Sequence, residues 1–207
     1  MSIIAQLATS LGRKDETPNL ELAAQIAKIN NKKAIQELVA NLSNKSKDLQ
    51  HDCIKTLYET ANLKPALIAA YFNDFISLLG SKNNRLQWGA MTALNYIAAE
   101  NFDAAFHALP AMAAAAEAGS VITRDHFVAI LIRLCANRQY AADAFTLLNE
   151  QLRHCPANQL PMYAENALPI INESNKTAIT QTLTARLNDF EKESKRKRVE
   201  KVLKKIR

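Results

Sequence analysis

The sequence predicts an all-α protein built from repeated helix pairs, and three observations support this fold class. Of the 207 residues, 48% are apolar, which is enough for a continuous core. The four glycines and six prolines are too few for the many turns of an all-β chain. Apolar residues recur at helical spacing, and several of them return at a constant step along the chain.

The constant step is 37 residues, and a column of leucines follows it. Its members are Leu20, Leu57, Leu94, Leu131 and Leu168. The neighbouring columns are mostly small or apolar. Equivalent positions in stacked repeats pack in equivalent surroundings, and these leucines lie on the apolar face of their helices. We therefore expect Leu57, Leu94 and Leu131 to be buried.

Each helix that carries this column is preceded by another apolar helix and a short polar connection. Pro65 is placed to start such a first helix, while Gly80 and Gly119 follow the ends of two others. The unit is therefore a helix, a turn and a helix. We expect one helical repeat domain over residues 1–193, with capping helices at its ends and repeats near 32–62, 64–100, 102–137 and 139–173.

The stretch GSKNNRLQWGAMTALNYIA, residues 80–98, resembles the second half of a HEAT repeat, with a polar loop and small residues leading to leucine and alanine. Pro110 is similar to the proline kink of HEAT first helices. The resemblance covers about residues 30–190 and weakens near Pro161 and Pro169. It implies a right-handed α-α superhelix, a HEAT-like (armadillo-type) solenoid of about four to five helix pairs. A tetratricopeptide array is the alternative, but its 34-residue step is not met.

Trp88, the only tryptophan, lies nearly opposite the buried stripe of its helix. In HEAT-like solenoids the outward face of the second helices lines the concave surface, so the resemblance implies a partner-binding site there. Large aromatic side chains dominate many interfaces. Peripheral packing of Trp88 is an equally open reading. The residues expected on this face are His51, Lys55, Tyr58, Trp88, Thr92, Asn95 and Asp125.

The net charge of +6 is concentrated at the C-terminus, where residues 191–207 carry nine Lys or Arg and three Glu. We expect residues 194–207 to form a basic helix or tail, and residues 1–190 to fold without residues 195–207. Either the chain bends near Ser194 or a second apolar stripe meets another surface. The tail can be a solvated cap, a localisation signal around KRKR, or a site for a polyanion or acidic partner. The candidate residues for the last role are Lys195, Arg196, Lys197, Arg198, Lys204 and Lys205.

Histidines and cysteines give no pattern typical of a metal site or a catalytic centre. We expect Cys53 and Cys135 to be core residues and Cys155 to be an exposed loop thiol. We predict no catalytic residues, no metal and no cofactor. The odd cysteine count, the lack of a signal peptide and the lack of a long apolar run predict a cytoplasmic protein without a membrane span.

These observations favour a non-enzymatic interaction module or scaffold that binds a protein or peptide partner. The alternative is a nucleic-acid-binding protein similar to the HEAT-like DNA-alkylation-repair proteins. The alternative is less favoured, because that family pattern implies a carboxylate about one turn beyond the tryptophan, where this chain has Thr92. Residues 1–190 are also neutral, whereas binding to phosphates needs clustered Lys or Arg.

Overall fold

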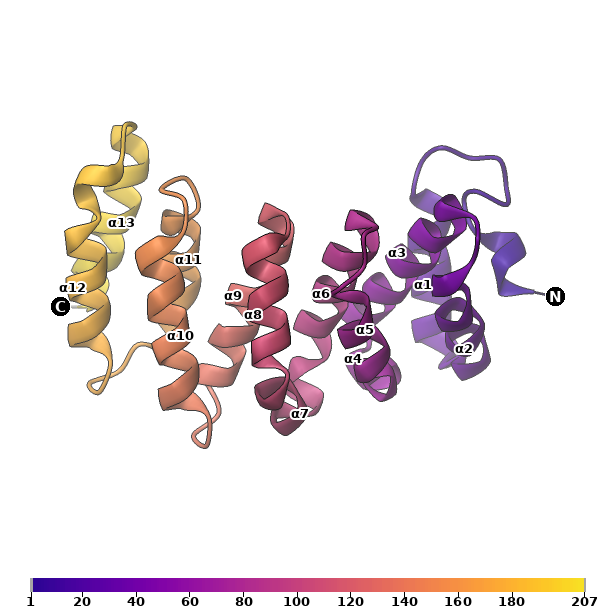
Figure 1. Ribbon diagram of the computed structural model, residues 1–207, viewed down its shortest axis with the longest axis horizontal. Coiled ribbons are helices and arrows are strands. Elements are labelled where there is room, and N and C mark those ends of the chain that lie inside the picture. Colours follow the sequence, from indigo (N-terminus) through magenta and orange to yellow (C-terminus); the bar gives the residue numbers. More distant parts are fainter. Residues whose placement is uncertain (1, 207) are drawn as a thin grey trace. The chain divides into compact units, whose positions relative to one another are not determined.

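The computed structural model describes residues 2–206, and within this range the regular elements are all helices (Figure 1). The all-α fold class is confirmed. The α-helices are α1 (Thr17–Ile29), α2 (Lys32–Ala40), α3 (Lys47–Leu63), α4 (Pro65–Ile68), α5 (Phe72–Leu78), α6 (Asn84–Ile97), α7 (Phe102–His107), α8 (Leu109–Ala118), α9 (Val121–Cys135), α10 (Ala141–His154), α11 (Leu160–Ala167), α12 (Lys176–Ala185) and α13 (Glu193–Ile206). The short 3₁₀ helices are Ile3–Gln6, Asn41–Ser43, Ala69–Tyr71, Ala98–Glu100, Leu168–Ile170 and Leu187–Asp189.

The chain divides into two compact units, unit 1 (Met1–Phe127) and unit 2 (Val128–Arg207). The division falls within α9. Each unit contains helices that are far apart in sequence but in contact, so each has its own core.

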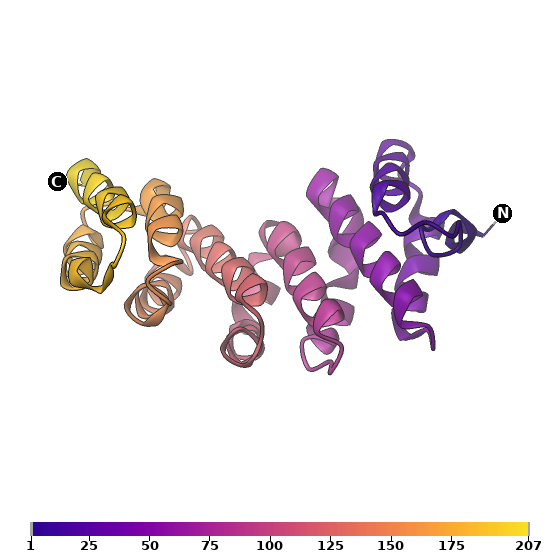
Figure 2. The same cartoon turned by 90° about the horizontal axis from the view of Figure 1, so that it is seen from above.

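In unit 1, α3 lies between α1 and α6 and contacts both along their lengths (Figure 1, Figure 2). The shorter helices α2 and α5 pack against α3 and α6, respectively. The apolar faces that meet are fully buried at Ile54, Leu57 and Leu94. Burial of such faces, rather than helix propensity, stabilises helices of this length.

Gly89 allows α3 and α6 to approach each other closely. A Cβ atom placed on Gly89 would lie 2.6 Å from Cγ1 of Ile54, which is itself fully buried. Any side chain at this position would therefore push the two helices apart or force Ile54 out of its rotamer.

Local sequence sets where the helices begin and end. The side chains of Ser46, Asn83 and Asn101 accept hydrogen bonds from the first backbone N–H groups of α3, α6 and α7. Pro65 starts α4, as predicted, and Pro110 lies in the first turn of α8. Because proline cannot continue a helix from the preceding turn, the helical stretch over residues 102–118 is broken between α7 and α8.

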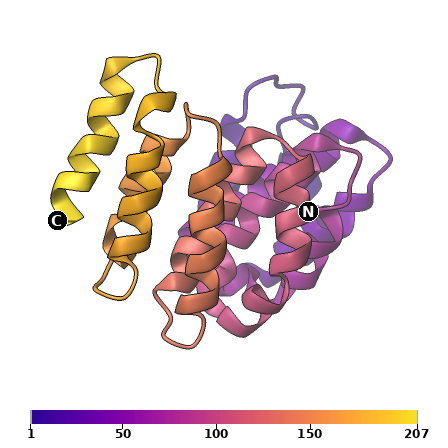
Figure 3. The ribbon, with the colours of Figure 1, turned by 60° about the vertical axis from the view of Figure 1, so that its left-hand side comes forward.

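Unit 2 pairs α10 with α12 and α11 with α13 (Figure 3). The chain turns between α12 and α13, so the alternative of a bend near Ser194 is confirmed. Val199, Val202 and Leu203 of α13 are buried. α13 begins at Glu193 and belongs to unit 2, so a separate segment over residues 194–207 stays a prediction.

The leucine column is buried in the centre of the chain and not at its ends. Leu57, Leu94 and Leu131 are fully buried, as predicted. Leu168 is half-buried, and Leu20 in the first helix is 43% exposed. The step of 37 residues therefore identifies core positions at Leu57, Leu94 and Leu131, but not at Leu20 or at Leu168, which starts a 3₁₀ helix.

Between residues 2 and 206, no helix combines the length and the apolar character needed to cross a lipid bilayer. The same described part of the chain contains no group of three His, Cys, Asp or Glu side chains placed to hold a metal ion.

Candidate functional site

Three of the seven predicted face residues, Lys55, Tyr58 and Trp88, meet in a cluster of aromatic and charged side chains on α3 and α6, which Glu16 joins from just before α1. We call this the Trp88 cluster, and its members are Glu16, Lys55, Tyr58, Glu59, Arg85 and Trp88. At its centre the rings of Tyr58 and Trp88 pack with centroids 5.8 Å apart and planes inclined by 52°. This offset, tilted geometry is favourable for aromatic pairs. It fixes the orientation of Trp88, which is half-buried.

Lys55 is enclosed by acidic and aromatic groups, and its side chain is only 12% exposed. Its Nζ lies 2.8 Å from Oε1 of Glu59, 3.2 Å from Oε2 of Glu16 and 5.0 Å from the centre of the Tyr58 ring. Burial opposes the charged form, but the bonds to Glu59, Tyr58 and Glu16 outweigh it and raise the pKa of Lys55 above its ordinary value. Lys55 is therefore a fixed positive charge within the cluster.

Arg85 also contacts the ring of Trp88. Its guanidinium carbon lies 5.8 Å from the centre of the Trp88 ring, at the distance of a cation–π contact. The same guanidinium donates a hydrogen bond to the Glu16 carboxylate, while its buried Nε has no partner among the described residues. Glu16 thus bridges Lys55 and Arg85 across α3 and α6.

Three of the predicted face residues are buried, so the expectation that they are exposed is wrong. Tyr58 is covered by Trp88 and Lys55. Thr92 turns its hydroxyl to the backbone oxygen of Trp88, 2.8 Å away. Asn95 lies 3.2 Å from Nδ1 of His126. Each is 7% exposed or less, because the neighbouring second helix covers positions that a single-helix projection places outside. Their role in binding a partner stays a prediction.

His51 and Asp125, the remaining predicted face residues, are half-buried. His51 Nε2 lies 3.1 Å from Oδ1 of Asn83, the residue that caps α6, so His51 links α3 to the start of α6. Asp125 lies beside His126 in α9, and burial lowers the pKa of His126 below its ordinary value of 6.5.

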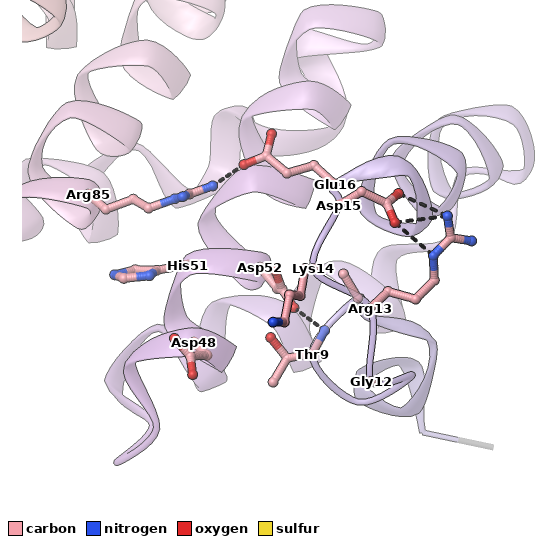
Figure 4. A pocket seen from close by; sticks show the side chains of 11 residues that line it. Thr9, Gly12, Arg13, Lys14, Asp15, Glu16, Asp48, His51, Asp52 and Arg85 are labelled. Carbon is pink, nitrogen blue, oxygen red and sulfur yellow. Dashed lines mark hydrogen bonds and ion pairs between the residues drawn. The ribbon is translucent and has the colours of Figure 1, made fainter.

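A polar hollow of about 390 Å³ opens next to the Trp88 cluster, between α3 and residues 8–16 (Figure 4). Asp52 holds this segment in place: one carboxylate oxygen accepts the Thr9 N–H at 2.7 Å, and the other accepts the amide of Asn19 at 2.7 Å. His51 and Arg85 line the opposite side of the hollow. Because the Asp52 carboxylate is occupied by these two donors, its observed role is to fix the segment that carries Glu16.

Glu16, Glu59 and Arg85 are the members of the site that the sequence did not predict, and Glu59 lies one helical turn after Lys55. Arg85 precedes Trp88 by three residues, and side chains at this helical spacing are neighbours, so its contribution could have been found. Glu16 lies 69 residues from Arg85 in the sequence. No spacing rule predicts that contact, which depends on how α1 packs beside α3.

The basic candidates of α13 differ in how they are engaged. Arg198 donates two hydrogen bonds, of 2.8 and 2.5 Å, to the carboxylate of Glu165 in α11, and this contact lowers the pKa of Glu165. Arg196 pairs with Glu200 at 3.0 Å, and Lys195 donates to Asn158. Lys197, Lys204 and Lys205 are exposed.

The cysteines are poor candidates for chemistry. Burial raises the pKa of Cys53 and of Cys135 to about 12, so both thiols stay protonated at neutral pH. Cys155 is 3% exposed, so the prediction of an exposed loop thiol is wrong. It is covered because Arg186 folds over the end of α10 and donates to the backbone oxygens of Leu152 and Cys155 at 2.9 and 2.8 Å.

Comparisons with known proteins identify a shared fold but no family. No family model and no curated protein matches the chain. Two crystal structures of engineered proteins from the Northeast Structural Genomics Consortium align with all of it. Both align with a TM-score of 0.61. The first is 20% identical in sequence, and the alignment covers 99% of its chain. The second is 18% identical, and the alignment covers 97% of its chain. The fold is shared.

A third engineered protein from the same consortium has a TM-score of 0.60 at 17% identity, and the alignment includes 99% of this chain. It is a longer protein, of which this chain covers 57%. At these identities the likeness concerns the backbone alone, so the function must be argued from the side chains of this chain.

Proposed function

We propose that the chain is a HEAT-like solenoid that acts as a non-enzymatic interaction module and binds a protein or peptide partner at the Trp88 cluster. The observation that carries the proposal is the half-buried Trp88 with Arg85 over its ring. Tryptophan and arginine are the residue types most enriched among side chains that dominate binding energy, especially at the centre of an interface.

Preorganisation of the cluster supports this proposal. Tyr58 of α3 and Glu16, which precedes α1, already hold Trp88 and Arg85 of α6 in defined positions. A partner that docks on these side chains therefore loses little rotamer entropy at this surface, which improves affinity. The half-buried His51, which lines the same hollow as Arg85 and Glu16, is suitable as part of a polar rim.

The charge of unit 1 favours a protein partner at this face over a nucleic acid. Unit 1 contains 12 basic and 12 acidic residues, and both cations of the Trp88 cluster already contact Glu16. A surface that binds phosphates needs uncompensated Lys or Arg.

The test is affinity capture from native extract with the immobilised wild type, Trp88→Ala and Tyr71→Ala. Tyr71 is a half-buried aromatic residue of unit 1 outside the cluster, so it provides a matched control. We expect a protein that binds the wild type and Tyr71→Ala, with the affinity for Trp88→Ala reduced at least about 30-fold, as for loss of a side chain worth 2 kcal/mol. Equal binding to all three would contradict the proposed site.

A further inference from the structure

The outer side of α13 presents a row of lysines that the rest of the molecule leaves exposed. We call it the lysine face, and it consists of Lys197, Lys201, Lys204 and Lys205. At 3.6 residues per turn these positions cover an arc of roughly 100°, opposite the buried Val199, Val202 and Leu203. Packing of α13 on α11 and α12 therefore forces the lysines outward.

Internal carboxylates neutralise the arginines of α13 but hardly touch the lysine face. Arg196 and Arg198 are paired with Glu200 and Glu165 at 3.0 and 2.5 Å. Lys197 has only a long contact of 3.9 Å, to Glu193, and its side chain is 70% exposed. Within residues 2–206, Lys201, Lys204 and Lys205 form no ion pair within 4.0 Å; the charges of Lys201 and Lys205 help to lower the pKa of Glu165, whose carboxylate is bonded to Arg198. The face thus keeps a local excess of positive charge.

The whole charge imbalance of the molecule lies in the unit that carries this face. Unit 2 has 14 basic and eight acidic residues, which accounts for the net charge of +6. The field of the unit therefore adds to that of the lysine face, and both attract polyanions.

We propose that the lysine face of α13 binds the phosphate backbone of nucleic acid without regard to sequence. This site is separate from the Trp88 cluster and does not depend on its function. Lysine is depleted in protein–protein interfaces, whereas its compact charge suits phosphate groups, which need no planar, bidentate donor. The side chains of the face are all lysines, with no exposed apolar residue among them that could enter a lipid interface.

The test measures binding of the full-length protein to a labelled 20-base-pair DNA duplex by anisotropy, as a function of salt concentration. Each neutralised phosphate contributes about −0.9 to the slope of log K against log salt, so four lysines predict a slope of roughly −3.6. Raising the salt threefold should then weaken binding about 50-fold. The variant Lys197→Gln/Lys201→Gln/Lys204→Gln/Lys205→Gln should lose most of this slope.

The matched control is Lys28→Gln/Lys32→Gln/Lys33→Gln/Lys45→Gln, which removes the same charge from exposed positions of unit 1. It should bind the duplex with nearly the wild-type slope. Single variants at Lys201 and Lys204, each expected to reduce the slope by about 1, repeat the test with less disturbance of the helix. An equal loss of the salt slope in the control variant would overturn the proposal. Tighter binding of the wild type to a poly-glutamate peptide, or to vesicles containing phosphatidylserine, than to the duplex would also overturn it.

Discussion

Leu94 and Leu20 occupy the same column of the sequence but different environments, and their comparison tests what the column means. Leu94 is fully buried between α3 and α6, whereas Leu20 is 43% exposed in the first helix. We expect Leu94→Ala to lower the free energy of unfolding by about 2–5 kcal/mol, because it removes buried methyl groups and leaves a cavity. Leu20→Ala should cost less than about 0.5 kcal/mol. Urea denaturation of both variants gives the two values, and equal costs would show that the column does not define the core.

His126 should make stability depend on pH near neutrality. Burial lowers the pKa of His126 in the folded protein below the ordinary value of 6.5. As the pH falls below that value, the unfolded state therefore binds more protons than the folded state. Stability should therefore decrease between about pH 7 and pH 5, and His126→Gln should reduce this decrease. The control is His154→Gln, at a side chain that is 78% exposed. Urea denaturation at pH 7 and pH 5 gives the change in the free energy of unfolding. An equal decrease in the wild type and in His126→Gln would show that His126 does not cause the pH dependence.

At the scale of single residues, the sequence predicted core positions better than surface positions. Helical periodicity correctly gave Leu57 and Leu131 as buried, because a buried stripe is a property of one helix. It failed at Tyr58 and Asn95, which a helical projection places on the outside but which contact residues of α6 and α9, respectively. The exposure of a side chain depends on the helices packed around it, and the helical projection of a single helix contains no information about them.

Among the elements, α13 is the one whose role the structure changes. The burial of Val199, Val202 and Leu203 argues against the expectation that residues 1–190 fold without this helix. The two apolar stripes of the sequence, one before and one after Ser194, now have a common explanation. The first stripe spans the end of α12 and the 3₁₀ helix after it, the second lies in α13, and α13 packs against α12.

Removal of residues 193–207 should therefore destabilise unit 2. Each buried aliphatic side chain of α13 contributes about 1.5–3 kcal/mol, and the faces of α11 and α12 beneath it would become exposed. We expect the melting temperature, followed by circular dichroism, to fall by more than about 5 °C, or the truncated protein to aggregate. The glutamine variant of the lysine face keeps the buried residues of α13 and should melt close to the wild type. A fall of less than about 2 °C on truncation would mean that α13 contributes little to the core.

For the whole molecule, composition and periodicity were sufficient to predict the fold class, because helix formation and amphipathic burial are local properties. The division into two units was not predicted, since the repeat of 37 residues runs through α9 without interruption. The concentration of positive charge at the C-terminus was visible in the sequence. The neutralisation of Arg198 by Glu165 was not, because it joins residues 33 positions apart.

The position of Trp88 also determines what optical spectroscopy can report about this protein. It is the only tryptophan and lies in α6 of unit 1, whereas the aromatic residues of unit 2 are two tyrosines, Tyr140 and Tyr163, and two phenylalanines, Phe145 and Phe190. Intrinsic tryptophan emission therefore follows the unfolding of unit 1 alone, while far-ultraviolet circular dichroism sums the helices of both units. Coincident melting curves from the two signals would indicate a single cooperative transition, and separate curves would resolve the stabilities of the two units without any label.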